Sequence, residues 1–168
     1  YFTDDFQVLP KDGYTSLFLK MLDHHNIQYR LNTKFEKSME LEFDHIFLCM
    51  PIDSYFNYCF GELPYRSLIF KNEILKNSSL PSTTINFTDN SKFTRKTQWD
   101  LLPNSNKAKD DKHTVTYEIP VDIKDNPGEY YYPVQTKSSR VLYEKYKDLA
   151  KINKKVTFCG RTGLFRYI

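Results

Sequence analysis

Arg95 and Arg161 are the residues of this sequence best placed to bind a phosphate. Arg95 closes the stretch Phe93-Thr94-Arg95, and Arg161 follows Gly160 directly at the end of an apolar run. Glycine allows a backbone to approach a ligand closely, and the guanidinium fork matches two oxygens of one phosphate. On the residues alone, a diphosphate site at either arginine competes with an exposed salt bridge.

A run of tyrosines, Tyr130-Tyr131-Tyr132, stands directly before Pro133. Proline disfavours the helical region for the residue before it, so we expect Tyr132 to be extended. Neighbouring side chains of an extended segment point to opposite faces, so one hydroxyl can reach a pocket while the next ring packs. A cluster of rings at a sheet edge is the alternative.

The histidines and cysteines do not form a metal-binding pattern, so we predict no metal site. His24 and His25 are adjacent and diverge on a helix, and Cys49, Cys59 and Cys159 lack metal-ligand spacing. Each cysteine lies in an apolar run. We therefore predict three buried free thiols in a reducing compartment.

The composition indicates a globular, cytoplasmic protein. The 168 residues are 40% hydrophobic and 16% aromatic, which allows a packed core. The formal charge is +3 and the basic residues are scattered, so we expect no nucleic-acid partner. No leader or membrane-length apolar stretch is present in the sequence, so we expect no membrane partner.

Apolar periodicity predicts two clear helices. The first runs from an N-cap at Thr15 to about His25, and the second begins at an N-cap at Ser138. Their buried sides are expected to be Leu17, Phe18, Met21 and Leu22 in the first helix, and Val141, Leu142, Tyr146 and Leu149 in the second.

Strand patterns outnumber the helical ones. They cover residues 27–31, 46–49, 67–75, 83–87, 113–119 and 155–159, with 46–49 and 155–159 expected to be buried. Strands and helices do not alternate regularly, which favours an α+β fold with a twisted, mostly antiparallel sheet.

Ordered motifs spread over nearly the whole chain are similar to those of one enzyme family. They are Leu9-Pro10, Pro51-Ile52-Asp53, Tyr65-Arg66-Ser67, Ile85-Asn86-Phe87-Thr88-Asp89, Phe93-Thr94-Arg95, Tyr131-Tyr132-Pro133-Val134 and Gly160-Arg161. In order and spacing they resemble the UDP-galactopyranose mutase family.

The resemblance implies that residues 1–168 are the C-terminal, sheet-rich portion of such an enzyme, contacting substrate and FAD. The large sheet would be joined by the C-terminal return strand of a Rossmann-like FAD domain that is not complete here. The family interconverts UDP-galactopyranose (UDP-galactose) and UDP-galactofuranose, which serves cell-surface polysaccharide biosynthesis. The implied route passes through a covalent adduct between reduced FAD and galactose, with no net redox change.

The resemblance also assigns roles to single residues. Arg95 would be catalytic, because it would grip the diphosphate and neutralise charge on the departing UDP. The substrate-contacting positions would be Phe6, Asn86, Tyr132 and Tyr167. The cofactor-contacting positions would be Arg66, Gly160 and Arg161.

The sequence also departs from the family pattern. Phe6 stands where a substrate-contacting tyrosine is usual, Met50 replaces a glycine, and Gln98-Trp99 replaces Glu-His. The family's Gly-rich FAD fingerprint precedes the part that matches. We therefore expect this chain to need the missing N-terminal portion of the same enzyme and to be inactive alone, and a homodimer is left open.

Two rival hypotheses remain. The departures at Phe6 and Met50 favour a divergent, non-catalytic module that binds a nucleotide sugar. Alternatively, the chain belongs to an amine-oxidase-like flavoenzyme that shares only the final strand and Gly160-Arg161, although this leaves the matches at Asn86, Arg95 and Tyr132 unexplained.

Overall fold

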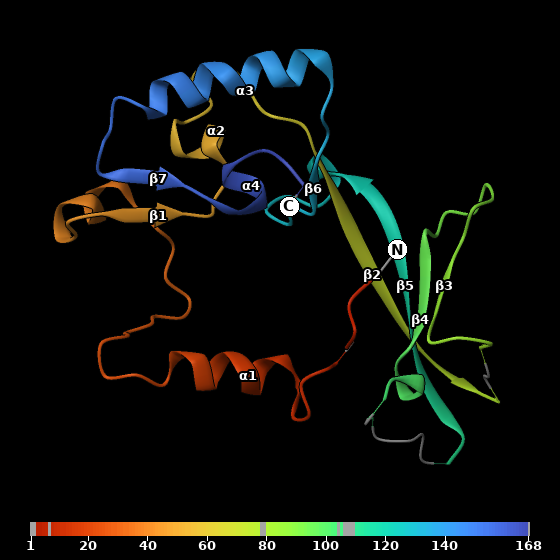
Figure 1. The fold of residues 1–168 in the computed structure, drawn as a ribbon. Coiled ribbons are helices and arrows are strands. Elements are labelled where there is room, and N and C mark those ends of the chain that lie inside the picture. Colours follow the sequence, from red (N-terminus) through yellow and green to blue (C-terminus); the bar gives the residue numbers. More distant parts are fainter. Residues whose placement is uncertain (1–2, 7, 78–79, 104, 106–109, 168) are drawn as a thin grey trace.

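The computed structural model describes residues 3–6, 8–77, 80–103, 105 and 110–167. Helices and strands are mixed without regular alternation, and a long twisted sheet dominates one side of the molecule (Figure 1). The predicted α+β class is confirmed.

The elements follow one another in an irregular order. The helices are α1 (Gly13–Leu22), α2 (Ile52–Tyr55), α3 (Lys137–Ala150) and α4 (Gly160–Gly163), with 3-10 turns at Lys37–Glu42, Trp99–Leu101 and Ile123–Asp125. The strands are β1 (Ile46–Leu48), β2 (Tyr65–Lys76), β3 (Thr84–Asn86), β4 (Arg95–Gln98), β5 (Lys112–Asp122), β6 (Tyr132–Pro133) and β7 (Val156–Phe158).

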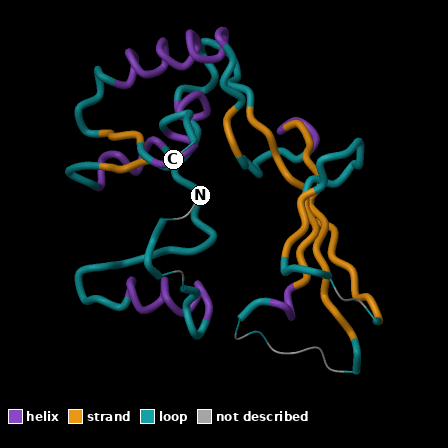
Figure 2. Tube along the Cα trace, turned by 45° about the vertical axis from the view of Figure 1, so that its right-hand side comes forward, coloured by secondary structure: helices purple, strands orange, loops and turns teal. Residues whose placement is uncertain are grey.

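The large sheet is antiparallel and, within the described residues, has the strand order β3-β4-β5-β2-β6. Its centre is the long pair β2–β5, which runs in unbroken register from Arg66 opposite Asp122 to Lys76 opposite Lys112. Figure 2 shows these strands side by side. The predicted strands 67–75, 83–87 and 113–119 are confirmed. A shift of one residue would exchange the two faces of this sheet, so the register decides which side chains meet.

The small sheet consists of β1 and β7, which are parallel, with Ile46 opposite Val156 and Leu48 opposite Phe158. The predicted strands 46–49 and 155–159 are confirmed in place. The prediction that they are fully buried is wrong, because Phe47 is 69% exposed. In the described residues β1 and β7 pair only with each other, so the outer edge of each strand has no strand partner there.

The core lies between the small sheet, α3 and the near end of β2. It is built from Ile52, Leu63, Tyr65, Tyr146 and Phe165. Burial of the Asp53 carboxyl raises its pKa, and the Leu63 N–H donates to its Oδ2 at 2.7 Å.

Helix α3 was predicted, but its cap and one packing residue differ. Thr136 is the N-cap, not Ser138, because its hydroxyl accepts from the Ser139 N–H and the Ser139 hydroxyl accepts in return from the Thr136 N–H. This reciprocal capping box satisfies two amide groups that the first helical turn leaves open. Tyr146 is buried as predicted, whereas Val141 is 58% exposed on the solvent side.

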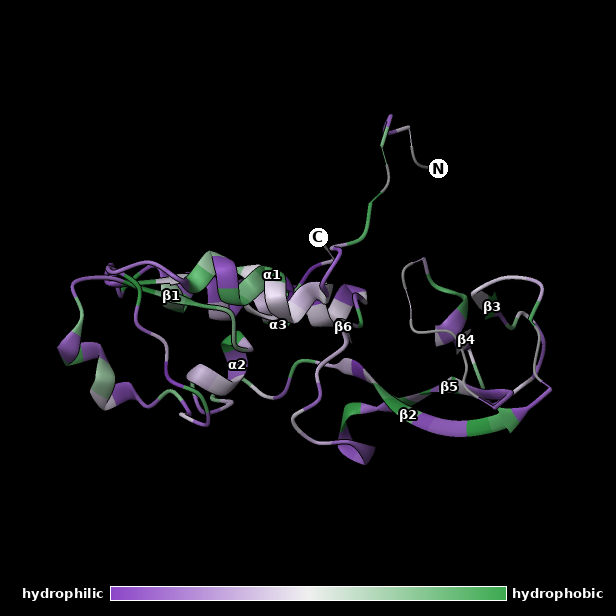
Figure 3. Ribbon diagram, turned by 90° about the horizontal axis from the view of Figure 1, so that it is seen from below, coloured by the Kyte–Doolittle hydropathy of each residue, from purple (hydrophilic) through white to green (hydrophobic). Residues whose placement is uncertain are grey.

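Helix α1 was also predicted, but its apolar side is not buried. The helix begins at Gly13 rather than after Thr15, and Phe18 and Met21 are 56% and 62% exposed. The hydrophobic residues of α1 stand out in Figure 3, and none of them is buried by another described element. The prediction of a strand at residues 27–31 is wrong as well, because this segment pairs with no strand among the described residues.

The cysteines are free thiols as predicted, but they are less buried than predicted. All three are free thiols, yet Cys49 and Cys59 are exposed and Cys159 is only partly buried. Cys49 and Cys159 follow directly after strands and Cys59 lies in a turn, so the apolar runs that contain them do not enclose them. Among the described residues, no helix is long and apolar enough to cross a membrane.

Candidate functional site

Three strands of the large sheet place Asn86, Arg95 and Glu118 in one row. The register sets Asn86 opposite Arg95, and Arg95 opposite Glu118. Arg95 Nε donates to Asn86 Oδ1 at 3.2 Å, and its Nη1 lies 3.4 Å from Glu118 Oε1. These contacts hold the guanidinium in place, while its side chain stays 43% exposed and keeps other N–H groups turned to solvent.

Arg66 and Tyr132 lie on the same face of the sheet as Arg95. Arg66 is opposite Tyr132 across β2–β6, and Phe70 is opposite Glu118 across β2–β5. Residues directly opposite each other in antiparallel strands share a face, as do residues an even number apart along one strand. The row that contains Arg66 and the row that contains Phe70 are four residues apart on β2, or roughly 13 Å at about 3.3 Å per residue. We call this set of residues the Arg95 face: Arg66, Phe70, Asn86, Arg95, Glu118 and Tyr132.

A second group of side chains, the Arg161 cluster, gathers at the β6 edge of this sheet. It consists of Arg161, Tyr131 and Tyr167. Arg161 Nη1 donates to the Tyr131 carbonyl at 2.6 Å, and the guanidinium lies 4.9 Å from the centre of the Tyr167 ring. The Tyr131 and Tyr132 rings are 5.5 Å apart, which links the Arg161 cluster to the Arg95 face.

Gly160 and Gly163 position the short helix α4 that carries Arg161. Gly160 has a φ of +70°, and a Cβ on it would meet Cys49 Sγ at 3.4 Å. A Cβ on Gly163 would come within 2.8 Å of the Leu48 carbonyl oxygen, so α4 packs directly on the end of β1. The Tyr65 hydroxyl donates to the Thr162 carbonyl at 3.0 Å and ties α4 to β2.

The structure therefore brings together most of the site residues predicted from the sequence. The exception is Phe6, which is 85% exposed and takes part in none of the ring or hydrogen-bond contacts among the described residues. Tyr131 was missed as a contact of Arg161. The tyrosine run pointed to it, but only the fold shows that its carbonyl receives the guanidinium.

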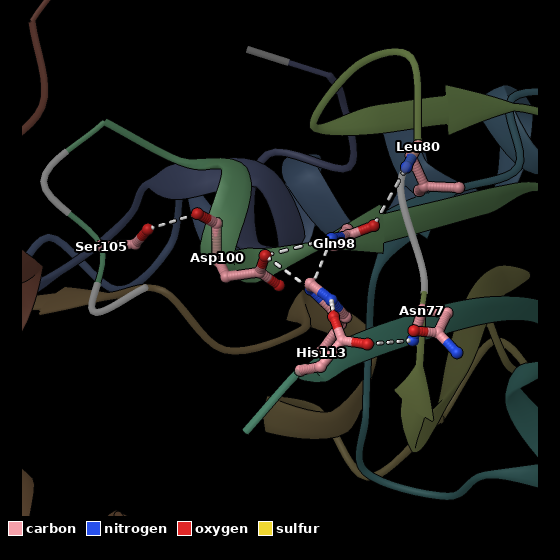
Figure 4. A network of polar contacts seen from close by, with 7 residues as sticks. Asn77, Leu80, Gln98, Asp100, Ser105 and His113 are labelled. Carbon is pink, nitrogen blue, oxygen red and sulfur yellow. Dashed lines mark hydrogen bonds and ion pairs between the residues drawn. The ribbon is translucent and has the colours of Figure 1, made fainter. Parts of the chain in front are cut away.

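A polar network on the opposite face of the sheet was also missed (Figure 4). His113 Nδ1 lies 2.9 Å from Asp100 Oδ2, and its Nε2 lies 3.1 Å from Asp111 Oδ1. The hydrogen bonds to Asp100 and Asp111 raise the pKa of His113. Gln98 is buried and contacts both His113 and Asp100. We interpret this network as a structural clamp between β4 and β5.

No group of three or more histidine, cysteine, aspartate or glutamate side chains among the described residues could hold a metal ion. The side chains that the described site offers to a ligand are arginine, asparagine and tyrosine donors. Such donors suit a diphosphate, because charged N–H groups form short, strong hydrogen bonds to phosphate oxygens.

Comparison with known proteins gives one consistent result. The family model described as UDP-galactopyranose mutase matches residues 1–167. The chain is 30% identical over 169 residues to a probable UDP-galactopyranose mutase of Klebsiella pneumoniae, covering 100% of the chain and 43% of that protein. It is 32% identical over 183 residues to the UDP-galactopyranose mutase of Mycoplasma genitalium, covering 100% and 45%.

A relative named for a different sugar nucleotide has a similar sequence identity. The dTDP-fucopyranose mutase of Escherichia coli is 30% identical over 176 residues, covering 100% of the chain and 46% of that protein. The chain thus spans less than half the length of the curated relatives it matches.

Proposed function

The chain belongs to the UDP-galactopyranose mutase family, and from this premise we propose that it is the sheet-rich C-terminal portion of a mutase that interconverts UDP-galactopyranose and UDP-galactofuranose. The missing N-terminal portion of the same enzyme is its necessary partner. The difference in length between the chain and its relatives supports this division. The proposal includes a cytoplasmic location, in keeping with three free thiols.

The observation that carries the proposal is the Arg95 face with the Arg161 cluster at its edge. Arg95 and Asn86 are neighbours in register, and Tyr132 shares their face. Because Asn86 Oδ1 accepts from Arg95, the amide N–H groups of Asn86 are left to donate to an anion. The face therefore offers several donors to a diphosphate.

Arg95 takes the catalytic role in this proposal. As the bond between the anomeric carbon and the diphosphate oxygen breaks, negative charge grows on the departing UDP. A guanidinium already fixed by Asn86 and Glu118 can stabilise that charge without first being reoriented. The Tyr132 and Tyr167 hydroxyls would hold the same diphosphate in reach while the sugar changes ring size.

Gly160 and Arg161 fit the FAD cofactor that the family uses. They follow the carboxyl end of a parallel strand pair, the edge at which dinucleotides bind in α/β sheets. Gly160 keeps the space beside Cys49 open, and Arg161 is a cation for a phosphate. Arg66 would be a further contact. When bound, reduced FAD supplies a nucleophile for the anomeric carbon.

Met50 stands where the family pattern has a glycine, but its side chain does not fill the space beside Gly160. Its side chain packs against the cluster of Leu48, Tyr55 and Val156 instead of standing free at the strand end. The replacement of a glycine by Met50 is therefore compatible with cofactor binding at Gly160.

A non-catalytic nucleotide-sugar-binding module is the second candidate. It is favoured by Phe6, which lacks a hydroxyl and is 85% exposed. Calorimetric titration with UDP and UDP-galactose separates the two, because a binding module responds in the absence of flavin.

Replacement of Arg95 in the full-length protein tests the proposal. With reduced FAD, we expect Arg95→Ala to lower turnover by about 100- to 1000-fold, as for the loss of one preorganised donor. The free energy of unfolding should change by only about 1 kcal/mol, since the Arg95 side chain is 43% exposed although its partner Glu118 is 13% exposed.

Lys96→Ala is the matched control. Lys96 is the next residue on β4, and it faces the other side of the sheet, against the Tyr117 ring. Lys96→Ala should leave turnover unchanged. Equal losses of turnover in both variants, or a loss of stability that matches the loss of turnover for Arg95→Ala, would assign Arg95 to structure and not to catalysis.

A further inference from the structure

Cys49 and Cys159 lie side by side where the two parallel strands end. Cys49 follows β1 and Cys159 follows β7, one step beyond the pair Leu48–Phe158. The Cys159 N–H donates to the Leu48 carbonyl at 2.9 Å, which extends the strand pairing to this position. The two Sγ atoms are 3.4 Å apart.

This spacing allows a disulfide with almost no backbone movement. Neighbouring strands are roughly 4.8 Å apart, inside the range of about 4.4–6.8 Å between the Cα atoms of bonded cysteines. The Sγ atoms need to approach by about 1.4 Å to reach the bond length of about 2.05 Å. Rotation about the two Cα–Cβ bonds supplies a movement of this size.

The surroundings also separate the roles of the two thiols. Cys49 is exposed and can meet a small molecule from solvent, whereas Cys159 is partly buried. The contact with Cys49 raises the pKa of Cys159, and either sulfur can be the donor in this hydrogen bond. Gly160 leaves this space open, because a Cβ there would already touch Cys49 Sγ.

We propose that Cys49 and Cys159 are a redox-responsive dithiol, which a low-molecular-weight disulfide converts to an intramolecular disulfide. The Cys49 thiolate attacks one sulfur of the small disulfide, forming a mixed disulfide and releasing one thiol. Cys159 gives up its proton and attacks Cys49 Sγ, which releases the second thiol. Two protein thiols are oxidised and one small disulfide is reduced.

The bond would join two segments 110 residues apart in sequence. It would fix the end of β1 to the residue directly before Gly160 and Arg161. The inference rests on the positions of the two thiols and holds whether or not the proposed mutase activity is correct.

Oxidised glutathione tests the proposal on the chain itself, with Cys59 as an internal control. Cys59 is also an exposed free thiol, but it lies in the turn before β2 and not beside Cys49 in the strand register. The chain is incubated with oxidised glutathione, quenched in acid, alkylated and cleaved after methionine, lysine and arginine. Met50 then separates Cys49 from Cys59, and Lys155 and Arg161 release Cys159 on a short peptide.

The expected result is that Cys49 and Cys159 lose their alkylation together and appear in one linked peptide that dithiothreitol separates. Cys159→Ser should stop the reaction at a glutathione adduct on Cys49, and Cys59→Ser should leave the linked peptide unchanged. A wild-type chain that accumulates the Cys49 adduct with Cys159 still alkylated would overturn the proposal. Links to Cys59 in equal yield would do the same.

Discussion

The Tyr146 hydroxyl joins α3 to the turn that leads into β2, and its removal should measurably loosen this joint. Tyr146 is fully buried, accepts from the Phe60 N–H at 2.9 Å and donates to the Gly61 carbonyl at 2.7 Å. Tyr146→Phe keeps the ring and deletes both bonds. The turn positions the start of β2, which carries Arg66.

The expected loss follows from these contacts. Two hydrogen bonds at about 1 kcal/mol each give about 2 kcal/mol. We take this lower value and not the larger penalty of a buried, unpaired group because Phe60 is 45% exposed. For a chain of this length, about 2 kcal/mol corresponds to a fall in Tm of about 4–8 °C.

Urea unfolding followed by circular dichroism measures the effect, and Tyr143→Phe is the control. Tyr143 is on the same helix and packs against Phe165, but its hydroxyl bonds to no described residue. We expect its free energy of unfolding to change by less than about 0.5 kcal/mol. If Tyr146→Phe behaves like Tyr143→Phe at unchanged m-value, the two hydrogen bonds do not hold α3 to the turn.

Two further predictions concern other parts of the fold. Gly163→Ala should cost about 1–3 kcal/mol and speed amide exchange in β1, because the new Cβ meets the Leu48 carbonyl at 2.8 Å. Gly128→Ala is strained by the backbone φ of +92°, but its Cβ meets no atom within 4 Å and it should leave β1 exchange unchanged, so equal exchange in both variants would refute the close packing. The hydrogen bonds to Asp100 and Asp111 raise the pKa of His113 above 6.5. Burial of the Asp100 carboxyl by itself raises its pKa, but its hydrogen bonds, the one with His113 foremost, together lower the pKa of Asp100 below 3.8. The stability difference between wild type and His113→Gln should therefore be largest between about pH 4 and 6.5 and fade above it, and a constant difference to pH 9 would contradict the ion pair.

Local patterns in the sequence were enough to locate the long strands. Residues 67–75 and 113–119 carry β-branched and aromatic side chains between turn signals, and they form the centre of the sheet. The ordered motifs placed Asn86 and Arg95 in separate segments. Only the antiparallel register showed that they are opposite each other and share a face with Tyr132.

The failures occurred where burial depends on distant surfaces. Helical spacing predicted α1, but whether Phe18 and Met21 are buried depends on what packs against them, and no described element buries them. Apolar neighbours suggested a buried Cys49, yet β1 ends one residue earlier, at Leu48, and the thiol is exposed. The helix N-cap is Thr136 and not Ser138 because side-chain geometry, not residue type, selects between hydroxyl residues that lie two positions apart.

Conversion of UDP-galactofuranose by the full-length protein with reduced FAD tests the central claim most directly. The account predicts UDP-galactopyranose as product over many turnovers, with the flavin still reduced at the end and no product without reduced flavin. Absence of pyranose product would contradict the proposed function. Stoichiometric change in the oxidation state of the flavin would point to a different flavoenzyme, and conversion of dTDP-fucopyranose alone would assign the chain to the other sugar specificity among its relatives.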